Sequence, residues 1–193
     1  MLTLYIAPGA SSMAPHIALN EIGCPFELKA LSFHANETRQ GEFLTVNPEG
    51  KVPTLVTEDG VLTEVAGVLY YLARLFPEAR LLPTGDAWAE ARVVSWMSFI
   101  ASAIHPARRQ GLDAAMAVYK IADGRLEDGA WAVGDYSIAD IHLFRLYWRF
   151  KASLKPPPGA FPGLDAHHDR MLARPAVIKT IETESAIGYE LPA

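Results

Sequence analysis

The segment Asn47–Thr57 constrains the fold more than any other, because a proline stands just before a short strand-like run. Proline has no N–H to give to a sheet ladder, so Pro53 belongs at the start or the edge of a strand. An X-Pro bond is also the kind of peptide bond that readily becomes cis, usually in a tight turn. A cis Val52-Pro53 bond would turn the backbone N–H and C=O of Val52 outward, free to pair with an extended, peptide-like ligand. A trans proline that merely begins a strand is the plain alternative.

The size and composition of the chain indicate a globular protein. Its 193 residues fit one large or two small domains, with enough length to bury a core. Half of the residues are hydrophobic and 20% are charged, which is ordinary for a soluble protein. No apolar run reaches the length of about 18 residues that spans a membrane. The first residues lack the basic flank of a signal peptide and predict a strand instead.

Charge and cysteine content exclude several classes of function. The net charge is −5 without a basic cluster, which argues against nucleic acid and anionic membranes as partners. A single cysteine leaves no disulfide framework and no zinc cluster, and it is typical of a cytoplasmic protein. The pair His167-His168 has no acids or cysteines at metal-ligand spacing, so we expect no metal.

The first 76 residues predict a mixed α/β domain. A β-prone run, Leu2–Ile6, precedes a turn and a helix that Ser11 or Ser12 can cap and Gly23 can end. Further on, an Asp-Gly turn joins two short strands into a hairpin. The expected elements are strands at 2–6, 26–31, 54–57 and 61–63, a first helix from Ser11 or Ser12 to Gly23, and helices at 38–46 and 64–76. The order is β-α-β-α-β-β-α.

The rest of the chain predicts helices only. Residues 77–85 hold two prolines and a glycine and are expected to link the first domain to an all-helical domain, residues 86–193. Helices are expected at 86–105, 112–126, 137–150, 162–173 and 175–184. Ser137 and Asp140 form a capping-box pattern, so the role expected of this acid is structural.

Four segments, in this order, resemble cytosolic glutathione S-transferases, and most closely the bacterial beta class. They are residues 8–19, 47–53, 62–73 and 134–140. The resemblance implies a thioredoxin-like glutathione-binding domain at 1–76 and a helical second domain. It also implies glutathione as co-substrate, a small apolar electrophile as second substrate, no metal, a homodimer, and a role in detoxification.

The resemblance places the catalytic step at the first turn. Conjugation needs the glutathione thiol as thiolate, and a free thiol has a pKa of about 8.5. A hydroxyl donor and a helix N-terminus both favour the anion, so Ser11 and Ser12 are the catalytic candidates. Plain helix capping is the alternative for either serine. The beta class typically has cysteine at the position of Ser11, so this chain cannot form a mixed disulfide with glutathione there.

Five further positions match the glutathione-binding residues of the family. The matching residues are His34, Val52, Pro53, Glu64 and Val65. The acid and the residue after it would hold the γ-glutamyl end, and His34 would contact the glycyl carboxylate. The family usually has serine or glycine where this chain has Val65, which removes a hydroxyl contact. Read without the family, Glu64 is simply an acid at a helix N-terminus.

His105 is the third catalytic candidate, because the beta class carries a histidine facing the thiol region at this place. A histidine that complements a helix C-terminus is the alternative. Ser98 stands where the class often has an asparagine, which reaches the glutathione of the partner subunit. Apolar residues beyond one helix stripe, among them Val93, Val94, Trp96 and Phe99, favour a dimer.

Two functions therefore compete at the level of sequence. The first is a glutathione transferase, with isomerisation and reductive dehalogenation as variants that use the same cofactor. The second is a non-catalytic binding or assembly module that keeps the fold, and Ser11, Val65 and Ser98 are the features in its favour. Retention on immobilised glutathione, followed by an assay with a halogenated aromatic, separates the two.

Overall fold

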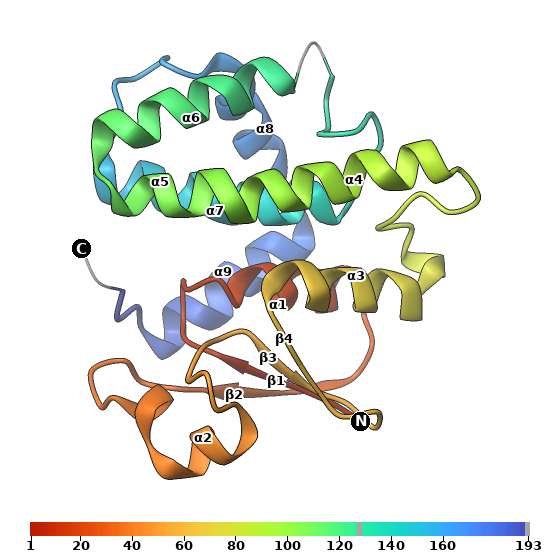
Figure 1. Cartoon of the computed structure of the whole chain (residues 1–193), viewed down its shortest axis with the longest axis vertical. Helices are drawn as coiled ribbons and strands as arrows, with labels where there is room; N and C mark the ends of the chain where they lie inside the picture. Colours follow the sequence, from red (N-terminus) through yellow and green to blue (C-terminus); the bar gives the residue numbers. More distant parts are fainter. Residues whose placement is uncertain (127–128, 192–193) are drawn as a thin grey trace. The chain divides into compact units, whose positions relative to one another are not determined.

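The computed structural model describes residues 1–126 and 129–191 and forms two compact units (Figure 1). One unit holds Met1–Leu72 together with Pro175–Ala193, and the other holds Ala73–Arg174. This division differs from the predicted domains, because the last helix joins the first unit and the change of unit falls inside a helix. The reason lies in packing: helix α9 (Pro175–Ile187) contacts helix α1 (Met13–Ile22) extensively.

The first unit is built on a mixed four-stranded sheet in the order β2-β1-β3-β4. Its strands are β1 (Leu2–Ile6), β2 (Phe26–Ala30), β3 (Thr54–Val56) and β4 (Val61–Thr63). Strands β1 and β2 are parallel, and the other two pairings are antiparallel. The hairpin predicted from Asp59-Gly60 is confirmed, with Thr57 donating its N–H to the Gly60 carbonyl at 2.8 Å. The sheet and its helices have the thioredoxin-like order that the resemblance implies.

Helices of the first unit lie on both sides of this sheet. Helices α1, α3 (Val65–Leu75) and α9 lie on one side, and the short helix α2 (Gly41–Val46) lies on the other (Figure 1). Gly23 ends α1 in the left-handed conformation, at φ 74°, and donates its N–H to the Leu19 carbonyl. This is the glycine stop predicted from the sequence.

The second unit is helical, as predicted. It contains α4 (Ala87–Phe99), α5 (His105–Arg109), α6 (Leu112–Arg125), α7 (Ile138–Leu154) and α8 (Pro162–Leu172). The predicted long helix is present, but a π-helical turn, Ile100–Ile104, separates α4 from α5. Aromatic rings fill the core, and Tyr119 stacks on Phe150 with ring centroids 4.2 Å apart. None of the helices within the described residues is long and apolar enough to span a membrane.

The capping box at the start of α7 is confirmed. Ser137 accepts the Ala139 N–H, and Asp140 accepts the Ser137 N–H at 2.9 Å. The second carboxylate oxygen of Asp140 accepts the Ala132 N–H at 2.8 Å and lies 3.0 Å from Nε2 of His167. Asp140 is therefore fully used in fixing the helix start and the preceding loop, which agrees with the structural role predicted for it.

Candidate functional site

The predicted binding segments of the first unit all lie at the same end of the strands of the sheet. Tyr5, Thr54 and Thr63 lie in one row across β1, β3 and β4. The segments beyond this row are therefore neighbours: the loop after β1, the residues before β3 and the start of α3. Strand β2 runs parallel to β1 and ends at the same edge, where Leu31 donates its N–H to the Ile6 carbonyl at 2.8 Å. The sheet register thus brings four separate motifs together.

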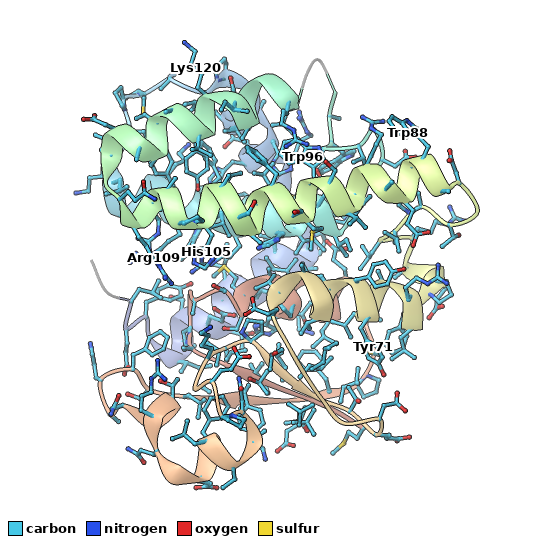
Figure 2. The ribbon with its side chains drawn as sticks, in the orientation of Figure 1. Tyr71, Trp88, Trp96, His105, Arg109 and Lys120 are labelled. Atoms are coloured by element: carbon cyan, nitrogen blue, oxygen red, sulfur yellow. The ribbon has the colours of Figure 1, made fainter. Side chains whose placement is uncertain are left out.

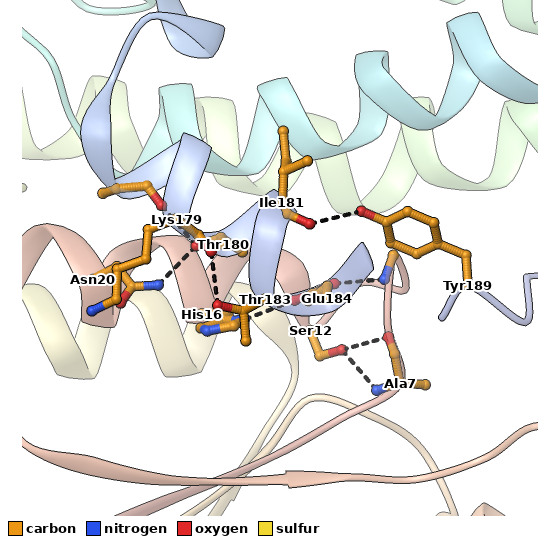
Figure 3. Close-up of polar contacts among 12 residues, drawn as sticks. Ala7, Ser12, His16, Asn20, Lys179, Thr180, Ile181, Thr183, Glu184 and Tyr189 are labelled. Carbon is orange, nitrogen blue, oxygen red and sulfur yellow. Dashed lines mark hydrogen bonds and ion pairs between the residues drawn. The ribbon is translucent and has the colours of Figure 1, made fainter. Parts of the chain in front are cut away.

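The two candidate serines differ in what they offer to a ligand. Ser12 is fully buried, and its hydroxyl donates to the Ala7 carbonyl and accepts the Ala7 N–H, both at 3.2 Å (Figure 3). It stands at the N-cap position of α1 without a side-chain capping bond, so the capping predicted for it is replaced by a link to β1. The Ser11 side chain is half-buried, and its hydroxyl has no hydrogen bond to any described residue. Of the two, Ser11 has the available hydroxyl.

The loop that carries Ser11 is hydrogen-bonded to the last helix, α9. Glu184 is fully buried, accepts the Gly9 N–H at 2.6 Å, and lies 2.8 Å from Nδ1 of His16. Gly9 has φ 73°, and a Cβ at this position would lie 2.6 Å from Leu191 and 2.9 Å from Tyr189. The role of Glu184 could not be predicted from the sequence, because an acid near the end of an amphipathic helix is typical of a solvated surface.

The segment before β3 offers a free backbone group. The Val52-Pro53 bond is cis, as predicted. Among the described residues, neither the N–H nor the C=O of Val52 has a hydrogen-bond partner. The loop is shaped by the buried Asn47, whose amide donates to the Lys51 carbonyl and to the Thr54 hydroxyl, both at 2.9 Å. A loop held by these hydrogen bonds, with an unpaired backbone at Val52, is suited to pair with an extended peptide ligand.

Glu64 immediately precedes α3 in a strained backbone conformation. Its φ is 64°, a left-handed value that costs a residue with a side chain on the order of 1–3 kcal/mol and that is concentrated at ligand sites. Its carboxylate is exposed, whereas the Val65 side chain is buried. At this position a ligand can use the Glu64 carboxylate and the N–H groups of the first turn of α3, whose dipole favours an anion.

The carboxylate of Glu190 binds the residues that follow β2. Glu190 accepts the Ser32 hydroxyl at 2.8 Å and the His34 N–H at 3.0 Å, and Nδ1 of His34 lies 3.7 Å from its other oxygen. The N–H of His34 and the Ser32 hydroxyl lower the pKa of Glu190. A cavity of about 150 Å³ lies here. It is lined by Pro8, Leu31, Ser32, Glu37, Ile187 and Glu190, among others. An anion contact was expected at His34, whereas no motif pointed to Ser32 or Glu190.

Comparison with known proteins agrees with this geometry. The family model for the glutathione S-transferase N-terminal domain matches residues 1–74, and the one for the C-terminal domain matches residues 96–175. A glutathione S-transferase of Xanthomonas campestris is 31% identical, with 95% of this chain and 98% of that protein covered. The chain belongs to the glutathione S-transferase family.

Solved structures support the same assignment. A glutathione transferase from Methylococcus capsulatus has a TM-score of 0.86 at 35% identity, with 96% of this chain and 100% of that one covered. A sphingomonad glutathione S-transferase complexed with glutathione has a TM-score of 0.84 at 32% identity, covering 95% and 98%. A beta class enzyme from Sphingomonas chungbukensis has a TM-score of 0.83 at 34% identity, covering 94% and 98%.

The remaining catalytic candidate of this glutathione S-transferase family member, His105, belongs to the helical unit. It is the first residue of α5, directly after the π-helical turn, and such turns are frequent at functional sites. Burial and the nearby cations Arg145, Arg109 and Arg108 lower the His105 pKa to about 4. The imidazole is therefore neutral at pH 7, with one nitrogen that can donate a hydrogen bond and one that can accept a hydrogen bond.

No metal site accompanies these residues. In the part of the chain that the structure describes, no group of three or more His, Cys, Asp or Glu side chains is arranged to hold a metal ion. His167, one of the paired histidines, is instead bound to Asp140 in the core of the helical unit. The roles of Ser11, Ser12, His34, Glu64 and His105 toward glutathione stay predictions.

Proposed function

We propose that this protein joins the sulfur of glutathione to an electrophilic carbon of a small, largely apolar substrate. The thiol loses its proton to solvent, the thiolate attacks the carbon to form a C–S bond, and the leaving group departs with the electron pair of the bond that breaks. Two effects lower the barrier: a lowered thiol pKa and the proximity of the two bound reactants.

Ser11 is the residue we assign to the thiolate. Its hydroxyl is unused by the fold, and it precedes α1, whose N-terminal amides add positive potential. A hydroxyl that donates to sulfur favours the thiolate over the thiol and so lowers the thiol pKa. Ser12 acts indirectly in this proposal, because its bonds to Ala7 fix the loop on which Ser11 stands.

The rest of glutathione is assigned to the same edge of the sheet. The Val52 backbone would pair with the cysteinyl part, as an added strand does at a sheet edge. Glu64 would bind the γ-glutamyl ammonium, and the first amides of α3 its carboxylate. The glycyl carboxylate would take the place that Glu190 occupies beside Ser32 and His34.

The convergence of these motifs at one sheet edge carries the proposal. The experiment is retention on immobilised glutathione, followed by an assay with chlorodinitrobenzene, for the wild type, Ser11→Ala and the surface control Ser185→Ala. We expect retention and turnover in the wild type and the control, and turnover lowered by about tenfold to a hundredfold in Ser11→Ala. Absence of both retention and turnover in the wild type would support the non-catalytic module instead.

We further propose that the protein is a cytoplasmic homodimer. Of the apolar residues that favoured a dimer at the level of sequence, Val93 and Trp96 are buried in this structure and do not support it. Val94 on α4 remains 49% exposed and provides the support instead. Trp88 on the same helix (Figure 2) is 75% exposed and supports it too. A single free cysteine, Cys24, is in keeping with a reducing compartment.

A further inference from the structure

The residues that follow the last helix fold back onto segments that we assign to glutathione. Helix α9 ends at Ile187, and we name the described residues that come next, 188–191, the strap. The strap, the loop after β1 and the end of β2 all belong to the first unit. Their contacts within this unit show which part of the proposed site the strap covers.

The strap is held by a set of donors that suits a carboxylate. Glu190 accepts the Ser32 hydroxyl at 2.8 Å and the His34 N–H at 3.0 Å. The His34 N–H and the Ser32 hydroxyl lower the pKa of Glu190, and the Phe33 N–H lowers it further. Donors from three consecutive residues thus converge on one carboxylate, as successive backbone N–H groups do in anion-binding turns.

The turn that carries these donors is fixed by its own hydrogen bonds. The Ser32 hydroxyl accepts the Ala35 N–H at 2.9 Å, which leaves the hydroxyl hydrogen to donate to another group. The Ser32 N–H donates to the Glu37 carboxylate at 2.6 Å, and the Glu37 N–H donates to the Ser32 carbonyl at 3.0 Å. Because none of these bonds involves the strap, the same donors suit a carboxylate from another molecule.

The strap also packs against the loop after β1. A Cβ at Gly9 would lie 2.6 Å from Leu191 and 2.9 Å from Tyr189, so both side chains lie directly against this glycine. The Tyr189 hydroxyl donates to the Ile181 carbonyl at 3.3 Å (Figure 3). The cavity of about 150 Å³ beside the strap is smaller than the roughly 300–1,000 Å³ of a typical ligand pocket. This size is expected if the strap fills part of a binding site.

We propose that the strap is self-inhibitory: Glu190 takes the place of the glycyl carboxylate, and glutathione must displace the strap to bind fully. This inference rests on the proposed function, which assigns the glycyl carboxylate to Ser32 and His34. Two carboxylates do not share these donors, because like charges a few ångströms apart repel. The tether from α9 to Glu190 is short, so the effective concentration of the competing carboxylate is high. The apparent affinity for glutathione falls with the fraction of molecules in which the strap is released.

A pair of ligands tests this competition by calorimetry. Glutathione and its glycyl monoethyl ester differ in the carboxylate for which the strap competes. We expect Glu190→Gln to bind glutathione severalfold more tightly than the wild type and to bind the ester with unchanged affinity. An equal gain for both ligands, or no gain for glutathione, would overturn the inference.

Two further variants separate displacement of the strap from a change in net charge. Leu191→Ala removes the side chain that lies against Gly9 and leaves the charge unchanged, so it should also tighten glutathione binding. Glu182→Gln removes an exposed charge from α9 and should change neither affinity. A gain in Glu182→Gln that equals the gain in Glu190→Gln, or no gain in Leu191→Ala, would reduce the effect to charge and reject the strap.

Nuclear magnetic resonance follows the strap itself. Heteronuclear NOE values of the amides of residues 189–191 report motion on the picosecond-to-nanosecond timescale and fall when a segment is released. We expect low values in free Glu190→Gln and in the wild type with glutathione, and high values in the wild type alone or with the ester. If glutathione binds and these values stay high, the strap is wrong and the proposed function stands. If glutathione does not bind to the wild type or to Glu190→Gln, both are rejected.

Discussion

The carboxylate of Glu184 accepts the backbone N–H of Gly9 at 2.6 Å, although 175 residues separate the two in the chain. Gly9 lies two residues before Ser11, in the loop that we assign to the thiol. The last helix therefore helps to set the position of the reacting group. It also explains why Pro175–Ala193 joins the first unit rather than the helical one.

Glu184→Ala should destabilise the protein strongly. The change leaves the Gly9 N–H and His16 buried without their partner, and each buried polar group left unpaired typically costs about 1–3 kcal/mol. Urea unfolding measures the loss, and Glu182→Ala, which removes an exposed acid from the same helix, is the control. Equal midpoints for the two variants would show that the Glu184 contacts are not important for stability.

The two serines should separate into a chemical and a structural role. We expect Ser11→Ala to raise the pKa of bound glutathione and to lower turnover by about tenfold to a hundredfold, with the fold unchanged. Ser12→Ala leaves buried groups of Ala7 unpaired and should cost about 1–3 kcal/mol of stability. Ultraviolet titration of the thiolate and thermal unfolding give the two readouts. The assignment fails if both variants titrate like the wild type.

Glu190 should compete with glutathione for Ser32 and His34. Glu190→Gln removes the charge that occupies this place, so glutathione should bind severalfold more tightly to the variant. Calorimetry with glutathione provides the measurement, and Glu78→Gln, an exposed acid of the other unit, is the control for net charge. Weaker binding to Glu190→Gln would mean that Glu190 organises the site instead of blocking it.

Stability should fall in mild acid because of the buried histidines. Burial, His105 and Arg145 lower the His142 pKa to about 3, whereas an unfolded histidine has a pKa of about 6.5. Between pH 6.5 and about 4 the unfolded state therefore binds the proton and the folded state does not, so stability decreases as the pH falls through this window.

Substitution of His142 measures the share of this pH dependence that one histidine contributes. His142→Gln should lessen the stability lost between pH 7 and pH 4 by on the order of 2–3 kcal/mol. The exposed His34→Gln should leave the loss unchanged. Denaturant unfolding at the two pH values is sufficient, and parallel curves for the wild type and His142→Gln would reject this explanation.

Local signals in the sequence predicted much of this structure. The proline at 53, the Asp-Gly turn and the Ser137–Asp140 box each act within a few residues, so their consequences can be read in order along the chain. The contacts of Glu184 and Glu190 could not be predicted in this way, because they depend on how the last helix packs against the first one.

Dimerisation should depend on the exposed apolar residues of α4. Trp88 and Val94 are 75% and 49% exposed, and large apolar side chains in that state favour a protein partner. A twofold contact is the usual arrangement for a homodimer, so each substitution acts twice in one interface. Light scattering at micromolar concentration should give twice the 21.1 kDa mass of the chain for the wild type.

The double variant Trp88→Glu and Val94→Glu should give the monomer mass. The control, Ala117→Glu with Lys120→Glu on α6, should leave the dimer intact. A monomeric wild type would remove the dimer from the proposed function without affecting the glutathione site, whose assigned residues all lie within the first unit.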